Sequence, residues 1–189
     1  TFLHKRAPKC TMPNPRGRVE YVHISLRIPT SLKESLEKDA SRDHMNLNSL
    51  VSKILVKYSS FDKIADLVGA IPLNTQLFGE MLNSVPQDRM ESIGKEIGPK
   101  LIRQTFTLLG IEYDIDSLIQ YYFEPLAAYS RWYRFYVVGT SPNRRLMFEH
   151  SHGGKWSAFL RHYITGIIKS ATGAEPKTTV SDDLVTVFC

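Results

Sequence analysis

Three polar residues alternate with apolar ones in the segment Tyr21–Pro29, which reads Y-V-H-I-S-L-R-I-P. His23, Ser25 and Arg27 share one face of an extended chain, because successive side chains point to opposite sides. The opposite face is apolar and consists of Val22, Ile24, Leu26 and Ile28. This two-residue period predicts a half-buried strand that Pro29 ends. The polar face is then either free to hydrogen-bond a ligand or an ordinary solvent-facing strand surface.

The positive charge of the chain is concentrated in its first third. The 189 residues include 24 Lys and Arg and 19 Asp and Glu, which gives a net charge of +5. Residues 1–60 contain 11 of the basic residues and only 5 of the acidic ones. Such an asymmetry is typical of contact with nucleic acid or a membrane surface, although a solvated basic tail has it too.

Residues 1–20 have the composition of a basic, extended arm. Pro8, Pro13 and Pro15 argue against a helix or a central strand there. Arg16 and Arg18 are candidates for contacts to DNA phosphates. The alternative is an arm that only increases solubility.

Two amphipathic helices are expected after Pro29. Thr30 or Ser31 can cap the first, and Ser31 with Glu34 has the spacing of a capping box. Asn46 can cap the second. The expected buried faces are Leu32, Leu36 and Ala40 in the first helix, and Leu47, Leu50, Val51, Ile54, Leu55 and Tyr58 in the second.

The predicted strand has no hairpin partner nearby in the sequence, so its backbone donors and acceptors need a partner from elsewhere. The strand and two helices make a unit of about forty residues, a size that normally requires oligomerisation or a staple. The two cysteines, Cys10 and Cys189, lie near opposite ends of the chain and form no disulfide scaffold. A second copy of the chain is the economical source of a partner strand, so we expect a homodimer.

The segment V-H-I-S-L-R-I-P-T-S-L-K-E-S-L-E-K-D-A-S-R-D-H-M-N-L-N-S-L-V-S-K-I-L-V-K-Y, residues 22–58, resembles a ribbon-helix-helix DNA-binding domain of the Arc and methionine repressor superfamily. The resemblance implies that two strands pair antiparallel across a dimer axis and enter the major groove. Arg27 can then donate two hydrogen bonds to a guanine, while Ser25 and His23 contact other base edges. The connection Asp43–Met45 stands where many members have a glycine, which predicts a wider turn.

The start of the second helix is a candidate phosphate site. Asn46, Asn48 and Ser49 place polar side chains beside backbone N–H groups without helical partners, where the helix dipole is positive. We expect these residues to contact DNA phosphates, with simple N-capping as the alternative. Lys53 and Lys57 lie further along and belong to a solvated face.

The rest of the chain predicts an α+β domain over residues 61–189. Helical spacing continues to Leu126, and Gly94 and Gly98 mark either a close helix crossing or a break at Gly98–Pro99. The later elements are a hairpin of Trp132–Val138 and Arg145–His150, a helix over Lys155–Ser170, and one or two strands within Thr178–Phe188. The expected fold class is α+β: the basic arm (1–20), a ribbon-helix-helix domain (21–60), then a helical segment and a C-terminal α+β domain with a small antiparallel or mixed sheet (61–189).

Two groups of residues in this C-terminal domain are candidates for ligand binding. His150, His152 and His162 are weak candidates for a transition metal, with structural or loop roles as the alternative. An aromatic cluster either lines an apolar pocket or forms core or a dimer interface, and its members are Tyr121, Tyr122, Phe123, Tyr129, Trp132, Tyr133, Phe135 and Tyr136. No cofactor is predicted, and a metal or small-molecule effector is left open.

Catalysis and membrane insertion have no support in the sequence. There is no glycine-rich phosphate loop, nucleophile elbow or HExxH motif, so we expect no enzyme. No apolar run approaches the ~20 residues that cross a bilayer, and no secretory signal is recognised, so we expect a cytoplasmic protein. The resemblance implies a homodimer that binds double-stranded DNA and regulates transcription, with the C-terminal domain supplying assembly or effector sensing. The alternatives are an antitoxin-like protein-interaction module and a metal- or ligand-responsive repressor.

Overall fold

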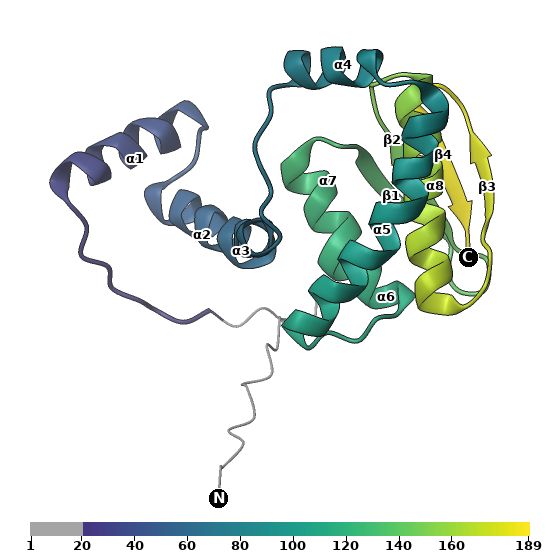
Figure 1. The fold of residues 1–189 in the computed structure, drawn as a ribbon. Helices are drawn as coiled ribbons and strands as arrows, with labels where there is room; N and C mark the ends of the chain where they lie inside the picture. The colour runs from purple at the N-terminus through teal and green to yellow at the C-terminus, as the bar shows by residue number, and fades with distance from the viewer. Residues whose placement is uncertain (1–20) are drawn as a thin grey trace, which may run out of the picture. The chain divides into compact units, whose positions relative to one another are not determined.

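The computed structural model describes residues 21–189, which form two compact units (Figure 1). The first unit ends at Ser59, and the second runs from Ser60 to Cys189. The described part of the first unit is helical, while the second unit combines helices with a sheet. Within residues 21–189, no helix is both long enough and apolar enough to cross a membrane.

The segment 21–29 forms neither helix nor strand in the single chain. A strand requires hydrogen bonds to a second extended segment. The described residues of the first unit contain no other extended segment of that kind, because they continue directly into two helices. Pairing with a second copy of the chain stays a prediction.

The two expected helices are present as α1 (Thr30–Arg42) and α2 (Leu47–Lys57). The predicted capping box of Ser31 and Glu34 is wrong, because both residues lie inside α1 and no side chain caps its start. Instead the Lys33 N–H donates to the Pro29 carbonyl oxygen at 3.1 Å. The helix therefore begins directly after the proline, with no position left for a serine cap.

The connection between α1 and α2 closes tightly without a glycine. The Met45 N–H donates to the Ala40 carbonyl oxygen at 2.9 Å, and the His44 N–H donates to the Ser41 carbonyl oxygen at 3.2 Å. These two bonds define a Schellman motif. His44 provides the left-handed residue, with φ of 54°, a conformation that costs about 1–2 kcal/mol for a residue with a Cβ. His44 thus takes the conformation that suits glycine, and the turn does not widen.

The helices of the second unit follow the predicted three- and four-residue spacing. They are α3 (Lys63–Leu67), α4 (Thr75–Ser84), α5 (Gln87–Leu109), α6 (Ile115–Leu118), α7 (Glu124–Ser130) and α8 (Gly154–Thr172), with a π-helical turn at Ile119–Phe123. Another π-helical turn, Tyr58–Asp62, includes the boundary between the two units. Gly110 and Gly173 end α5 and α8 in left-handed conformations, with φ of 66° and 77°.

A four-stranded antiparallel sheet has the order β1-β2-β4-β3. Its strands are β1 (Arg134–Val138), β2 (Arg145–Glu149), β3 (Lys177–Val180) and β4 (Leu184–Phe188). The predicted hairpin is confirmed as β1 and β2, and α8 connects β2 to β3. The chain is therefore of mixed α and β class, as expected.

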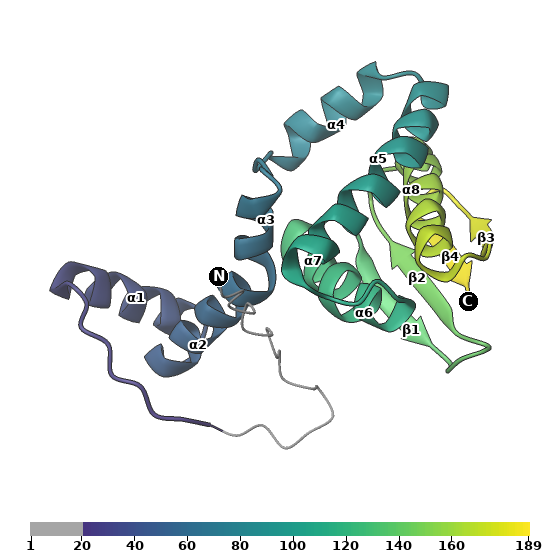
Figure 2. The same cartoon turned by 60° about the horizontal axis from the view of Figure 1, so that its bottom comes forward.

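The core of the second unit lies between one face of the sheet and the helices. Leu146, Phe148, Val185 and Val187 point from β2 and β4 into this core and are fully buried. The Phe123 ring packs against the Phe148 ring with 5.2 Å between centroids. Figures 1 and 2 show α8 between α5 and the strands β3 and β4, so that α8 is covered on two sides.

The long helix α5 crosses α8 at close range through glycines. A Cβ on Gly94 would lie 2.7 Å from the Phe159 carbonyl oxygen, and one on Gly98 would lie 2.8 Å from the Tyr163 ring. From the other helix, a Cβ on Gly166 would lie 2.9 Å from the Pro99 side chain. Of the two expectations for this region, the close crossing is confirmed. The break is wrong, because α5 continues through Pro99 to Leu109.

Candidate nucleic-acid interface

The three proposed base-contacting residues lie in the irregular segment before α1. His23, Ser25 and Arg27 are all exposed, and within residues 21–189 their side chains make no hydrogen bond or ion pair. The backbone of this segment is likewise not bonded to any described residue before Pro29. Among residues 21–189, therefore, no partner is present for these side chains or for the backbone groups before Pro29.

The apolar residues that alternate with them are also uncovered. The exposed fractions are 85 % for Val22, 58 % for Ile24, 59 % for Leu26 and 39 % for Ile28. The expected buried face of α2 is only partly buried: Leu50 is buried, while Ile54, Leu55 and Tyr58 stay exposed. That prediction is wrong for the single chain, because the described part of the first unit contains no surface that covers these three side chains.

The start of α2 has the cap that was predicted. The Asn46 side-chain oxygen accepts a hydrogen bond from the Ser49 N–H at 2.8 Å. The Asn48 and Ser49 side chains are exposed beside the first turn, where helical N–H groups lack partners. The arrangement is compatible with an anion at this helix end, and the phosphate contacts stay a prediction. Arg16 and Arg18 lie outside the described residues.

Two of the three basic residues of α1 form ion pairs within the helix. Lys33 pairs with Glu37 at 2.6 Å, and Arg42 pairs with Asp39 at 2.9 Å. These exposed pairs contribute little to stability, typically about 0–1 kcal/mol each. Arg27 forms no such pair within the described residues.

The three histidines considered for a metal all take part in hydrogen bonds, and those of His150 and His152 are joined. His150 is buried, its Nδ1 accepts from the His152 N–H at 3.3 Å, and its Nε2 lies 2.9 Å from the Ser157 hydroxyl. Nδ1 is thus unprotonated and Nε2 carries the proton. Burial, with the nearby His152, lowers the pKa of His150 to about 4, so the ring is neutral at pH 7.

His162 lies on α8 and faces Glu91 of α5, with 3.1 Å between Nε2 and the carboxylate oxygen. Across residues 21–189, no group of three histidine, cysteine or acidic side chains has a geometry that could hold a metal ion. The bonds to Ser157 and Glu91 instead describe structural roles for His150 and His162.

The aromatic cluster of the second unit packs mostly as core. Phe123 and Tyr133 are buried, and the Trp132 ring meets the Trp156 ring with 5.2 Å between centroids. The hydroxyls of Tyr122 and Tyr163 lie 2.6 Å apart, and burial raises the pKa of both groups, that of Tyr163 to about 12. The core alternative therefore describes most of this cluster, although Tyr136 stays exposed.

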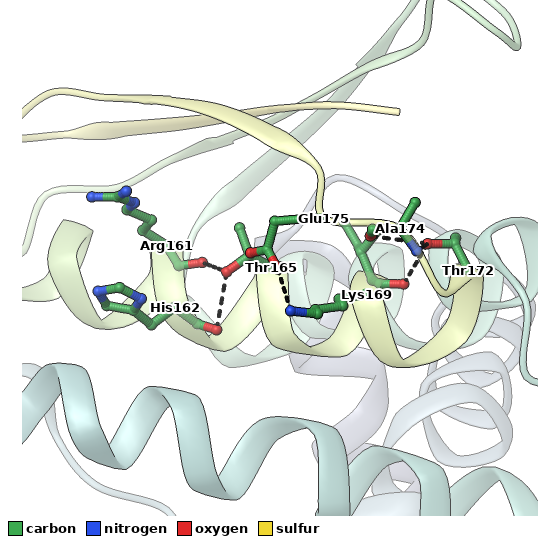
Figure 3. A network of polar contacts seen from close by, with 8 residues as sticks. Arg161, His162, Thr165, Lys169, Thr172, Ala174 and Glu175 are labelled. Atoms are coloured by element: carbon green, nitrogen blue, oxygen red, sulfur yellow. Dashed lines mark hydrogen bonds and ion pairs between the residues drawn. The ribbon is translucent and has the colours of Figure 1, made fainter.

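The sequence did not indicate a groove of about 620 Å³ between α8 and the segment that enters β3. Arg161, His162 and Thr165 line it from α8, Phe188 lines it from β4, and the other wall is Glu175–Thr179. Figure 3 shows the α8 side chains together with Glu175. The amphipathic pattern marks Arg161 as a polar position on a helix, but nothing in it relates that residue to a strand that begins after the next loop.

Comparisons of the chain with models of known families, with curated proteins and with solved structures found no match.

Proposed function

We propose that the protein is a sequence-specific DNA-binding transcriptional regulator that acts as a homodimer through a ribbon-helix-helix domain at residues 21–60. The observation that carries the proposal is the uncovered segment before α1, with apolar and polar side chains on alternate faces and no backbone partner within the described chain. The two helices that follow, joined by a glycine-like turn at His44, complete the pattern that the resembling family has.

A second copy of the same segment would supply both partners for the backbone groups and a cover for the apolar side chains of this unit. Antiparallel pairing of the two segments would bond the exposed N–H and C=O groups. It would also let Ile24, Leu26 and Ile28 pack against helices of both copies. Complete burial of one such side chain contributes about 1.5–3 kcal/mol, so several per chain are sufficient to hold a small dimer.

If Ile24, Leu26 and Ile28 face the helices, then His23, Ser25 and Arg27 lie on the outer face of the two-stranded ribbon. A two-stranded ribbon fits the major groove of B-DNA, where each base pair presents a distinct set of donors and acceptors. We assign Arg27 to a guanine, with Ser25 and His23 as secondary base contacts. Each good base contact contributes about 1–3 kcal/mol of discrimination.

We assign to the start of α2 the phosphate contacts that orient the protein on the DNA duplex. Asn46 holds the helix end through its bond to Ser49, and the neighbouring Asn48 side chain is free to reach a phosphate. Such contacts add affinity that falls with salt but carry no sequence preference.

The direct test is selection of bound sequences from a random double-stranded DNA pool by the full-length protein. We expect a palindromic consensus, since a symmetric dimer reads two equal half-sites. Arg27→Ala should remove the preference for this consensus and leave weak, salt-sensitive binding to all sequences. Arg42→Ala, which removes an arginine already paired on α1, is the matched control and should keep the consensus. A pool without enrichment, or an Arg27 variant that weakens all sequences equally, would contradict the assignment.

A further inference from the structure

One face of the sheet in the second unit belongs to the core, and the opposite face carries exposed side chains. The core face is marked by alternate residues of β2 and β4 that are fully buried, namely Leu146, Phe148, Val185 and Val187. Figures 1 and 2 show α5 and α8 on the same side of the strands. Because successive side chains of a strand point to opposite faces, the residues between the buried ones form the second face, which we call the outer face.

Both exposed aromatic rings of the second unit lie on the outer face. Among residues 60–189, Tyr136 and Phe188 are the only phenylalanine, tyrosine or tryptophan side chains that are exposed, with exposed fractions of 46 % and 39 %. Tyr136 is opposite Met147, and Phe188 is opposite Arg145, and both partners alternate with the buried residues of β2. A strand separation of ~4.8 Å and a rise of ~3.4 Å per residue place the two aromatic positions about 12 Å apart, so they suit two separate planar groups.

Positive charge is concentrated on the same face. Phe188 of β4 has Arg145 of β2 on one side and Lys177 of β3 on the other. Arg134 also lies on the outer face, opposite Glu149, which is the only acidic residue among the positions of the four strands. Residues 61–189 as a whole contain 13 basic and 14 acidic residues, so this face is positive in a nearly neutral unit.

The one carboxylate of the outer face is bonded within the face. The Tyr136 hydroxyl donates to the Glu149 carboxylate at 3.2 Å, and the Arg134 guanidinium lies 3.8 Å from the same oxygen. These contacts offset the negative charge of Glu149 and limit the rotation of the Tyr136 ring.

We propose that the outer face of the sheet binds single-stranded nucleic acid. Such a strand combines negative phosphates with planar bases that stack on aromatic side chains, which matches a ring between two cations. Tyr136 and Phe188 would each stack on one base, while Arg145 and Lys177 would contact the phosphates beside it.

Other occupants fit this face less well. The bases of a duplex are already stacked on one another, and a sheet of four strands is about 14 Å across, which exceeds the ~12 Å width of the major groove. A second copy of the same face would bring like charges together, and an acidic peptide would leave the two rings without planar partners.

The test is fluorescence anisotropy of the full-length protein with a labelled oligothymidylate about 12 nucleotides long, in excess unlabelled duplex DNA that occupies the first unit. An oligouridylate of the same length distinguishes DNA from RNA, and saturable binding of either strand supports the proposal. An abasic strand of the same length keeps the phosphates without the bases, and it should bind at least about tenfold more weakly.

The two rings are tested by truncation. Tyr136→Ala and Phe188→Ala should each weaken binding of the oligonucleotide about fivefold or more, because a stacked base is lost. Tyr136→Phe keeps the ring and should keep the affinity. Val137→Ala, at an exposed residue of β1 that points to the other face, is the matched control and should change nothing. Circular dichroism would establish that each variant is folded.

The two cations are tested through salt. Arg145→Ala and Lys177→Ala should each reduce the slope of log affinity against log salt concentration by about 0.7, the change expected for one phosphate contact on a single strand. Lys100→Ala removes an exposed cation of α5 and should leave this slope unchanged.

Four results would overturn the proposal: displacement of the oligonucleotide by the duplex, its displacement by polyglutamate at equal charge concentration, equal affinity for the abasic strand, or unchanged affinity in the double variant of Tyr136 and Phe188. Arg27→Ala, which tests the proposed ribbon, should leave binding of the single strand unchanged. Failure of the ribbon proposal is therefore distinguishable from failure of this one.

Discussion

The two units of the chain have similar amphipathic patterns, but they differ in how many of their apolar side chains are buried. In the second unit, Phe123, Phe148 and Leu160 are fully inaccessible to solvent. Among the described residues 21–59, only Ala40 and Leu50 are buried. The apolar residues of the first unit are in regular positions, so what it lacks is an opposing surface.

The comparison shows that an amphipathic pattern specifies a surface to be covered but not what covers it. In the second unit, α8 is covered by α5 and by the sheet of the same chain. In the first unit, we assign the covering surface to a second chain. Stability of the second unit should then be independent of protein concentration, whereas that of the first should increase with it.

The largest effect is expected for a core truncation in the second unit. Phe148→Ala should lower the free energy of unfolding by about 3–5 kcal/mol, because a fully buried ring is lost and a cavity is left. Leu108→Ala, at a leucine that is 72 % exposed, should change it by no more than about 0.5 kcal/mol. Urea unfolding measures both, and similar losses in the two variants would contradict the assigned core.

The next effect tests the assigned dimer surface. Leu26→Asp should raise the dimer dissociation constant at least about 100-fold, or about 2.7 kcal/mol, because a charge replaces an apolar side chain on the face that pairs. Leu108→Asp places the same charge at an exposed leucine of the second unit and should leave association unchanged. Sedimentation equilibrium measures the constant, and a dimer that tolerates Leu26→Asp would show that the interface lies elsewhere.

A smaller effect on stability, with opposite signs, is expected for substitutions at two helical glycines of the second unit. Gly94→Ala should destabilise by about 1–3 kcal/mol, because the added Cβ meets the Phe159 carbonyl oxygen, which belongs to the backbone and cannot turn away. Gly79→Ala in α4 has open space and should stabilise by up to about 1 kcal/mol through helix propensity. Thermal unfolding compares the two, and a neutral Gly94→Ala would mean that α5 and α8 are not in close contact.

The smallest effect concerns the turn of the first unit. His44→Gly should stabilise by up to about 1 kcal/mol, because glycine adopts the left-handed φ without the steric cost that a Cβ brings. The gain should be seen in the transition of the first unit, and Asp43→Gly, at a residue with φ of −87°, should give none. A destabilised His44→Gly protein would indicate that the imidazole makes contacts in the assembled dimer.

Local patterns predicted most elements of the fold. Asn46 indicated the start of α2, and the segments Trp132–Val138 and Arg145–His150 indicated a hairpin, because each signal depends on nearby residues only. The capping box at Ser31 was a false signal, since the proline before it already supplied the first helical acceptor. Burial of Ile54 and Leu55 was predicted from periodicity alone, which cannot show whether a covering surface exists in the same chain.

The proposed base-contacting residues could be predicted from the sequence, whereas the groove beside α8 could not. His23, Ser25 and Arg27 were recognisable together because a strand places alternate residues on one face, so neighbours in sequence become neighbours in space. The groove beside α8 is lined by residues that are separated in the sequence by a helix end and a loop, so it depends on how α8 packs against β3.

The amino-acid sequence alone determined the helical and extended segments, the basic character of the first third, and the alternation that predicts a DNA-reading face. Only the tertiary structure decided that α5 runs unbroken through Pro99, that His150 bonds to Ser157 while His162 bonds to Glu91, and that α8 and the segment entering β3 line one groove. The reason is that periodicity and capping depend on interactions within a few residues. Helix crossings, buried hydrogen bonds and grooves depend on contacts between segments whose relative positions are set by the packing of the whole unit.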